Sequence, residues 1–357
     1  MDLMEFYRGK NILITGHTGF KGSWMCKVLQ LAGANVTGYA LRPPTEPNLF
    51  KLIGIEKKMQ SLEGDIRDIS SLEKVFHDVK PEIVFHLAAQ PLVRESYKNP
   101  VYTYEVNVLG TVNVLECIRN EESVRSFVNI TTDKVYKNKE WCWGYRESEE
   151  LNGFDPYSNS KACSELVTSS YKNSFFNEKK IGLSTARAGN VIGGGDFAVD
   201  RIIPDCIRSV EMNKHISVRN PYSIRPYEHV LEPISAYLLL AKAQYDNISY
   251  AGNYNIGPNE CDCISTGELV TLFCEKWSKI SGKQISWINE YDGGPHEAEF
   301  LKLDCSKIKQ VLNWEPHWNI ETAMEKIVEW TYLYLLGEDV NGCMEQQIKE
   351  FFREVRI

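Results

Sequence analysis

The sequence lacks the features that mark secreted, membrane-spanning and zinc-binding proteins. Its ten cysteines are scattered, and no two of them have the C-x-x-C spacing of a zinc knuckle or a redox dithiol. The most apolar stretch, around Tyr237-Leu-Leu-Leu-Ala241, is too short to cross a bilayer. The acidic beginning of the sequence does not resemble a secretory signal. We therefore expect a cytoplasmic protein that holds no metal and keeps its thiols reduced.

An excess of positive charge is also absent. The 40 Lys and Arg residues are outnumbered by 48 Asp and Glu residues, which gives a formal net charge of −8 at pH 7. Because such a surface repels phosphate-rich polymers, neither nucleic acid nor an anionic membrane is an expected partner. The 24 Gly and 14 Pro residues among 357 are too few for a low-complexity chain. At about 150 residues per domain, the length suggests two domains.

Strand-like and helix-like segments alternate through the first half of the chain. The expected strands lie at 11–15, 34–40, near 64–65, at 82–89, 126–131 and 182–187. Helices are expected at 21–31, from residue 70 onward, at 100–120 and at 158–176. Ser70-Ser-Leu-Glu73 has the pattern of a capping box, which places a helix start there. This alternation predicts an α/β fold with a Rossmann-type, doubly wound parallel sheet.

The alternation ends near Gly189, where a glycine-rich loop follows. Three further helices are expected at 232–244, 266–281 and 320–336. We predict a nucleotide-binding domain at 1–189 that also receives segments from about 220–260. A smaller, mixed α/β C-terminal domain at 190–357 would then bind the substrate.

The segment Thr15-Gly-His-Thr-Gly-Phe-Lys-Gly22 lies between the first strand and the first helix. Gly16 permits a tight turn, Gly19 lets the backbone approach a pyrophosphate, and Gly22 allows the helix to pack closely on the strand. The free N–H groups at the helix start would then face the phosphates. The loop predicts a dinucleotide site, and its glycine spacing is typical of short-chain dehydrogenases.

The second strand lacks the acidic residue that usually binds the adenosine ribose, since it ends in Tyr39-Ala-Leu-Arg42. Arg42 could meet the 2′-phosphate of NADP, or it could simply lie exposed at the strand end. Asp65 follows the third strand, where it could contact the adenine or form a turn. From the residues alone, the role of Arg42 and the role of Asp65 both stay open.

Five residues form the clearest catalytic pattern. Tyr157 and Lys161 would share one helix face, where the ammonium lowers the pKa of the phenol so that it can act as a base. Thr132 directly follows the expected fifth strand and can hydrogen-bond the substrate hydroxyl that is oxidised. Asp133 and Lys134 add an acid/base pair that elimination of water requires and simple oxidation does not. The alternative for this last pair is a solvated loop.

Further motifs extend along nearly the whole chain, in segments 16–24, 86–94, 131–134, 143–147, 157–161, 187–196, 219–226, 295–298 and 303–307. With them the chain resembles the NDP-sugar dehydratases of the extended short-chain dehydrogenase/reductase family, in particular those that act on CDP-glucose. Related dTDP-sugar and GDP-sugar dehydratases have Glu where this chain has Lys134. The resemblance implies 4,6-dehydration of CDP-D-glucose to CDP-4-keto-6-deoxy-D-glucose in deoxysugar synthesis for surface polysaccharide. It also implies NAD rather than NADP.

The resemblance further implies roles for individual residues. Tyr157, with Lys161 and Thr132, would take the proton of the sugar 4-hydroxyl, Lys134 would act as the base at C5, and Asp133 would protonate the departing C6 hydroxyl. Substrate contacts would come from Asn190, Arg225 and Glu297. Arg225 offers a bidentate fork for a diphosphate. The long helices that contain Tyr102 and Ser164 would pair in a homodimer. The expected cofactor contacts, besides Tyr157 and Lys161, are Gly16, His17, Gly19, Phe20, Gly22, Arg42, Asp65, Ile66, Ala88, Gln90 and Asn107.

Three alternatives remain at this point. A 4,6-dehydratase for another nucleotide sugar would keep all five catalytic residues. An NDP-sugar epimerase of the same fold would keep Tyr157 and Lys161 without needing Asp133 and Lys134. A non-catalytic NAD(P)-binding protein would keep the glycine loop and lose the tyrosine–lysine pair, and the presence of that pair disfavours it.

Overall fold

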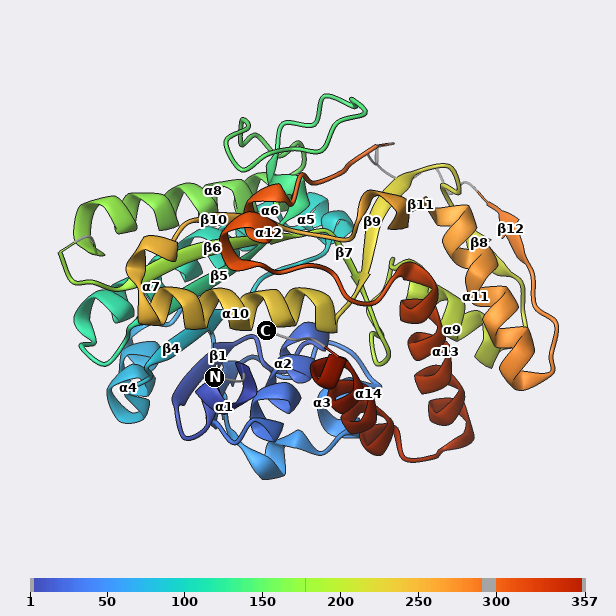
Figure 1. Cartoon of the computed structure of the whole chain (residues 1–357), viewed down its shortest axis with the longest axis horizontal. Coiled ribbons are helices and arrows are strands. Elements are labelled where there is room, and N and C mark those ends of the chain that lie inside the picture. Colours follow the sequence, from blue (N-terminus) through green and yellow to red (C-terminus); the bar gives the residue numbers. More distant parts are fainter. Residues whose placement is uncertain (1–2, 177, 291–299, 355–357) are drawn as a thin grey trace.

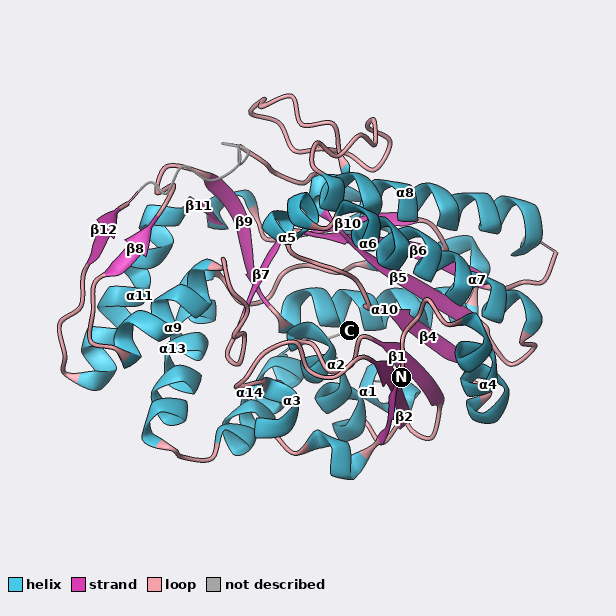
Figure 2. Ribbon diagram, turned by 180° about the vertical axis from the view of Figure 1, so that it is seen from behind, coloured by secondary structure: helices cyan, strands magenta, loops and turns pink. Residues whose placement is uncertain are grey.

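A seven-stranded parallel sheet lies at the centre of the larger part of the molecule (Figures 1 and 2). The computed structural model describes residues 3–176, 178–290 and 300–354. The strand order β10-β6-β5-β4-β1-β2-β3 confirms the predicted Rossmann-type topology. The strands are β1 (Asn11–Thr15), β2 (Asn35–Ala40), β3 (Gln60–Glu63), β4 (Ile83–His86), β5 (Ser126–Thr132), β6 (Gly182–Ala188) and β10 (Asn253–Ile256).

Helices cover both faces of this sheet because its strands carry apolar side chains on both sides. Ile12 and Ile14 of β1 point into one hydrophobic cluster, and Leu13 between them points into the other. The first cluster is covered by α1 (Leu3–Tyr7), α2 (Phe20–Leu31) and α10 (Leu231–Asp246), and the second by α4 (Ile69–Val79) and α7 (Gly110–Asn120). Helix α8 (Pro156–Tyr171) packs against β5 and α7, and a π-helical turn joins α6 (Pro100–Tyr104) to α7.

The predicted capping box at Ser70–Glu73 is wrong. Helix α4 begins at Ile69, and its N-cap is Asp68. The Asp68 carboxylate accepts hydrogen bonds from the Ser71 backbone N–H at 3.2 Å and from the Ser71 hydroxyl at 2.6 Å. An earlier acidic residue therefore satisfies the helix start, and the serines lie inside the first turn.

The smaller part of the molecule contains two short sheets packed against helices (Figure 1). A β11-β9-β7 sheet and a β12-β8 pair surround a hydrophobic cluster of their own. The strands are β7 (Asn190–Ile192), β8 (Ile216–Val218), β9 (Ile224–His229), β11 (Cys263–Ser265) and β12 (Trp287–Asn289). The helices are α9 (Ile202–Glu211), α11 (Thr266–Ser281) and α13 (Ile320–Leu336), with α3 (Leu49–Leu52), α5 (Val93–Lys98) and α12 (Ser306–Leu312) elsewhere in the fold.

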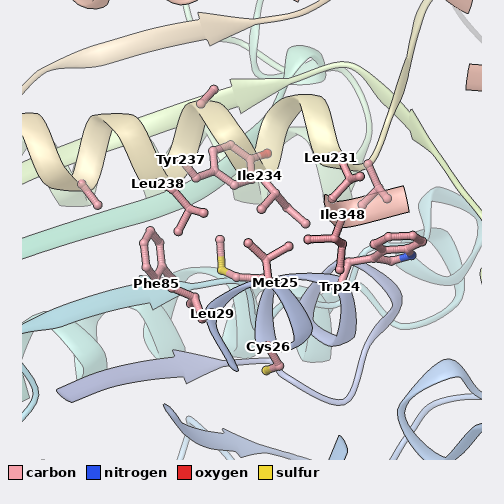
Figure 3. Close-up of a cluster of buried hydrophobic side chains, with 14 of the residues drawn as sticks. Trp24, Met25, Cys26, Leu29, Phe85, Leu231, Ile234, Tyr237, Leu238 and Ile348 are labelled. Atoms are coloured by element: carbon pink, nitrogen blue, oxygen red, sulfur yellow. The ribbon is translucent and has the colours of Figure 1, made fainter. Parts of the chain in front are cut away.

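The last helix, α14 (Val340–Glu354), returns to the larger core. Figure 3 shows Met25 of α2 pointing toward Ile234 and Leu238 of α10, with Ile348 of α14 beside Trp24. Strand β10 also comes from the second half of the chain and extends the sheet beyond β6. The domain boundary expected at residue 189 stays a prediction. All ten cysteines are free, and no described helix is long and apolar enough to span a membrane.

Candidate active site

The glycine loop between β1 and α2 has the geometry of a pyrophosphate cradle. Gly16 has a φ of +78°, and a Cβ there would lie 2.6 Å from the Ala88 backbone nitrogen. A Cβ on Gly22 would lie 2.3 Å from the Gly16 carbonyl oxygen, so both positions require glycine. Gly19 is the N-cap of α2 and supplies no side-chain cap, which leaves N–H groups at the helix start available to an anion. The loop therefore fits a dinucleotide.

Two residues predicted to contact the cofactor, His17 and Arg42, have side-chain partners within the protein. The His17 ring is fully buried, its Nε2 lies 2.7 Å from the Ser61 hydroxyl, and burial lowers its pKa to about 4. Arg42 is 83% exposed, and its Nε donates to both carboxylate oxygens of Glu63 at 2.9 and 3.0 Å. His17 thus ties the glycine loop to β3, and Arg42 is paired with a carboxylate.

The remaining predicted cofactor residues follow β3 and β4 or lie on neighbouring helical segments. Asp65 pairs with Arg67 at 2.7 Å, and Ile66 packs against Gly110. Asn107 accepts from the Gln90 backbone N–H at 2.8 Å and donates to the Ser160 hydroxyl at 2.8 Å. The buried Asn107 amide therefore fixes the segment after β4 to the helix that carries Tyr157. Phe20 begins α2, and its ring lies against Gly193.

Thr132, Asp133, Lys134 and Tyr157 meet where β5 ends and α8 begins. The Thr132 hydroxyl donates to Asp133 Oδ1 at 2.9 Å, and Thr132 lies close enough to the Tyr157 phenol to lower its pKa. Lys134 Nζ lies 3.4 Å from the same Asp133 oxygen. Asp155 caps α8 by accepting from the Ser158 backbone N–H at 3.0 Å, which sets the start of the helix just before Tyr157. The fold therefore brings together four of the five residues that were predicted to be catalytic.

Lys161 lies one helical turn after Tyr157, but its ammonium group contacts a backbone carbonyl of β5. Its Nζ donates to the Ile130 carbonyl at 2.8 Å, and burial lowers its pKa to about 8. The pKa of Tyr157 is raised to about 12, chiefly by burial, although its hydrogen bond with Thr132 acts in the opposite direction. The lowered phenol pKa expected from the sequence is therefore not found in this structure, because desolvation of the buried phenol is the largest influence on its pKa.

A buried ion pair that was not predicted from the sequence lies next to these residues. Glu165 and Arg187 have side chains that are each 1% exposed, and Arg187 Nε and Nη2 donate to the two Glu165 oxygens at 3.0 and 2.9 Å. The same carboxylate accepts from the hydroxyls of Thr131 and Thr185. Arg187 Nη1 also donates to the Tyr136 phenol at 2.8 Å. The network joins β5, β6, α8 and the loop after Thr132.

A second missed residue is Glu228 on β9. It is 2% exposed, and neither carboxylate oxygen has a hydrogen-bond partner within the described residues. Burial raises the pKa of Glu228 well above its usual range, with nearby Glu232 and Asp133 adding to the rise and Lys21 opposing it. Lys21 Nζ donates to the Tyr237 phenol at 3.2 Å, and its own pKa is lowered to about 8 by burial. A buried carboxyl with a raised pKa therefore lies near Asp133 and Lys21.

The predicted substrate residues fall on the strands of the smaller part. Asn190 begins β7, and Arg225 lies on β9, which pairs with β7 in parallel. Arg225 is 6% exposed, and its Nη1 donates to the Ile224 carbonyl at 3.0 Å. Glu297 lies outside the described residues. Within the part of the chain that the structure describes, no group of three or more His, Cys, Asp or Glu residues is placed to hold a metal ion.

Comparison with known proteins places these features in one family. Residues 13–327 match the family described as GDP-mannose 4,6-dehydratase. The chain is 47% identical over 353 residues to CDP-glucose 4,6-dehydratase from Salmonella typhimurium, covering 97% of each chain. It is 26% identical over 346 residues to dTDP-glucose 4,6-dehydratase from Haemophilus influenzae, covering 91% of this chain and 98% of the relative.

Solved structures share the fold. One is UDP-glucose 4-epimerase from Thermotoga maritima with UDP-glucose, with a TM-score of 0.76 and 22% identity over 91% of this chain and 99% of that one. Another is dTDP-glucose 4,6-dehydratase from Bacillus anthracis in complex with NAD, with a TM-score of 0.73 and 21% identity over 91% of this chain and 97% of that one.

Proposed function

Because this chain belongs to the GDP-mannose 4,6-dehydratase family of NDP-sugar dehydratases, we propose that it is a hydro-lyase that converts CDP-D-glucose to CDP-4-keto-6-deoxy-D-glucose and water with NAD. The observation that carries the proposal is the contact of Asp133 and Lys134 with Thr132 and, through it, with Tyr157. We place the reaction in the cytoplasm, where it would feed deoxysugar synthesis for surface lipopolysaccharide.

The five residues divide the proton transfers between them. Tyr157 takes the proton from the sugar 4-hydroxyl, with Thr132 and Lys161 assisting. NAD, when bound, would accept the hydrogen from C4 and return it to C6. The 4-keto group acidifies the C5–H bond, so that neutral Lys134 can remove that proton. Asp133 protonates the C6 hydroxyl as it leaves as water.

Arg225 and Asn190 are our proposed contacts to the substrate diphosphate. Arg225 is buried and presents a guanidinium fork, which is the group that best matches paired phosphate oxygens. Asn190 begins the neighbouring strand. Glu297 remains our proposed contact to the nucleoside ribose.

We expect NAD to bind more tightly than NADP because the Arg42 guanidinium already forms an ion pair with the Glu63 carboxylate. A 2′-phosphate near Arg42 would meet the negative charge of Glu63. Glu63→Gln should therefore tighten NADP binding by roughly two- to five-fold, the size of an exposed charge interaction, and leave NAD binding unchanged. Titration calorimetry with both cofactors measures this, with Glu338→Gln as the surface control. Equal affinities of the unmodified protein for NAD and NADP would contradict the assignment.

A homodimer is also part of the proposal, formed through the outer faces of α6, α7 and α8. Large apolar side chains are exposed on α6, on the π-helical turn between α6 and α7, and on α8: Val101 at 71%, Leu109 at 57% and Leu166 at 57%, respectively. Solvent-exposed apolar clusters of this kind mark interfaces between subunits.

Leu166→Asp should shift the protein from dimer to monomer in light scattering coupled to size-exclusion chromatography, because the charge would be buried without a partner. Leu336→Asp on α13 is the matched control, since Leu336 is also 57% exposed but lies outside the proposed interface. Dimers that persist in Leu166→Asp at the same concentration would place the interface elsewhere.

The substrate assignment is tested by offering NDP-hexoses one at a time. Each reaction is followed by the absorbance that 4-keto sugars develop in base, and the product is identified by NMR. We expect turnover with CDP-D-glucose and a much lower kcat/KM with the dTDP, GDP and UDP sugars. A 4-epimer as the product, or a preference for another nucleotide, would overturn the assignment.

A further inference from the structure

A series of buried hydrogen bonds joins the start of the glycine loop to the helix that carries Tyr157. His86, the last residue of β4, lies at its centre and is 1% exposed. The ring Nδ1 lies 2.7 Å from the hydroxyl of Thr15, the residue before Gly16, and Nε2 lies 3.2 Å from the hydroxyl of Thr111 on α7. Both threonines are buried as well, so these three side chains have almost no surface that a bound cofactor could contact.

The neighbours of His86 decide which ring nitrogen carries the hydrogen. The Thr111 hydroxyl lies 2.7 Å from the Asn107 backbone carbonyl, which can only accept, so the single hydroxyl hydrogen of Thr111 is used there. Thr111 must therefore accept from His86, which places the ring hydrogen on Nε2. Nδ1 is then the acceptor, and Thr15 donates to it. The Thr15 oxygen in turn accepts from the Ala88 backbone N–H at 3.3 Å.

This assignment requires a neutral ring, because a protonated imidazole has no acceptor nitrogen. Burial, together with the positive charge of Lys161, lowers the pKa of His86 to about 3, so the ring is neutral near pH 7. The Ser164 hydroxyl on α8 lies 3.1 Å from the Thr111 hydroxyl and is the second donor to that oxygen. Both ring nitrogens and all three hydroxyls then have partners, as buried polar groups require.

The hydrogen bonds continue from Asn107 to the catalytic helix. Asn107 lies in the π-helical turn Glu105–Leu109, and its side chain donates to the Ser160 hydroxyl at 2.8 Å. Ser160 donates at 2.7 Å to the backbone carbonyl of Tyr157 in the same turn of α8. The backbone at Tyr157 is therefore connected, through His86, to the residue that precedes the glycine loop.

We propose that His86, as its Nε2–H tautomer, is a positioning residue that holds the glycine loop and the catalytic helix in one arrangement. The hydrogen bonds set the separation between the dinucleotide site and Tyr157, because removal of hydrogen from C4 and of the proton from O4 needs both groups at one sugar carbon. The inference rests on the proposed function, since it takes the dinucleotide and Tyr157 to act on one substrate. His86 itself contacts neither cofactor nor substrate.

The test measures NAD affinity without substrate, and kcat for CDP-D-glucose at saturating NAD. His86→Phe keeps a planar ring and removes both nitrogens, and Thr111→Val removes the hydroxyl and keeps the side-chain shape. Titration calorimetry should show NAD binding about 10-fold weaker in each variant, and kcat should fall by roughly 10- to 10²-fold. Because either change interrupts the same series of hydrogen bonds, the double variant should lose no more than the more affected single variant.

Thr168→Val is the matched control. Thr168 is 2% exposed on α8, donates to the Ser164 carbonyl at 2.8 Å and accepts from the Asn129 side chain at 3.0 Å. It is equally buried and hydrogen-bonded but lies outside the connection through His86. We expect Thr168→Val to be less stable in urea, with NAD affinity and kcat unchanged.

The tautomer is tested by NMR of protein that contains ring-¹⁵N-labelled histidine, with the His86 signals identified by their loss in His86→Phe. Near pH 7 the signal of Nε2 should be that of a nitrogen bonded to hydrogen, and the signal of Nδ1 that of a bare nitrogen. A hydrogen on Nδ1 would overturn the assignment.

Other outcomes would contradict the positioning role. Unchanged NAD affinity and kcat in His86→Phe, with stability reduced as in Thr168→Val, would show that His86 serves only the core. Additive losses in the double variant would show that His86 and Thr111 act separately. If His86→Phe does not fold, unchanged NAD affinity and kcat in Thr111→Val would refute the proposal. The proposed function fails separately, if the unmodified protein binds NAD but forms no 4-keto product from CDP-D-glucose.

Discussion

Replacing Lys134 with methionine should reduce product formation by roughly 10²- to 10⁴-fold while oxidation at C4 continues. Methionine keeps much of the length of the side chain and removes the amine that lies 3.4 Å from Asp133 Oδ1. Without a base at C5, the 4-keto intermediate has no route to elimination, so the reduced form of the cofactor should accumulate. Its absorbance in a single turnover, compared with the quantity of 6-deoxy product, measures the two steps separately.

Lys137→Met is the matched control for this experiment. Lys137 follows Lys134 by three residues, but its side chain is half exposed and pairs with Glu150 on the surface. We expect this control to turn over at the normal rate. Normal turnover by Lys134→Met would show that Lys134 is not the C5 base.

Replacing Arg187 with methionine should destabilise the protein by about 3–5 kcal/mol, because Glu165 would be left as an unpaired buried charge. The Thr131 and Thr185 hydroxyls would still donate to the carboxylate, but they supply no opposite charge. Urea unfolding, followed by circular dichroism, measures the change in the free energy of unfolding. The loop after Thr132 should loosen as well, because Arg187 also donates to Tyr136.

The double variant Glu165→Met with Arg187→Met serves as the control for lost packing. Removing both charges avoids the unpaired carboxylate, so the double variant should be more stable than Arg187→Met alone. A double variant as unstable as the sum of the two single variants would mean that the two groups do not act as a pair.

The sequence predicted the parts of the fold and site that depend on local pattern. The apolar runs of β1 and β5 are buried on both faces, so they could be recognised as central parallel strands without knowing their neighbours. Tyr157 and Lys161 are one helical turn apart, and Thr132 ends a strand, so both positions follow from local structure. The parallel sheet then brings Thr132 next to the start of α8.

The missed features depend on residues that are distant in the sequence. Glu165 and Arg187 are separated by 22 residues and lie on a helix and a strand, where nothing local indicates that they pair. Glu228 lies in a short strand, and its proximity to Asp133 arises only when β9 approaches the main sheet. The direction of the Tyr157 pKa was wrong for the same reason, since burial is a property of the whole fold and the i+4 lysine is only a neighbour in sequence.

The most direct test of the account uses CDP-D-glucose that carries deuterium at C4. A 4,6-dehydratase that works through NAD moves the hydrogen from C4 to C6 of the same sugar. We predict a product whose C6 methyl group contains one deuterium, visible by NMR and as a mass increase of one unit over the unlabelled product. A 4-epimer that keeps its deuterium at C4, or a 6-deoxy product without deuterium at C6, would contradict the proposed reaction.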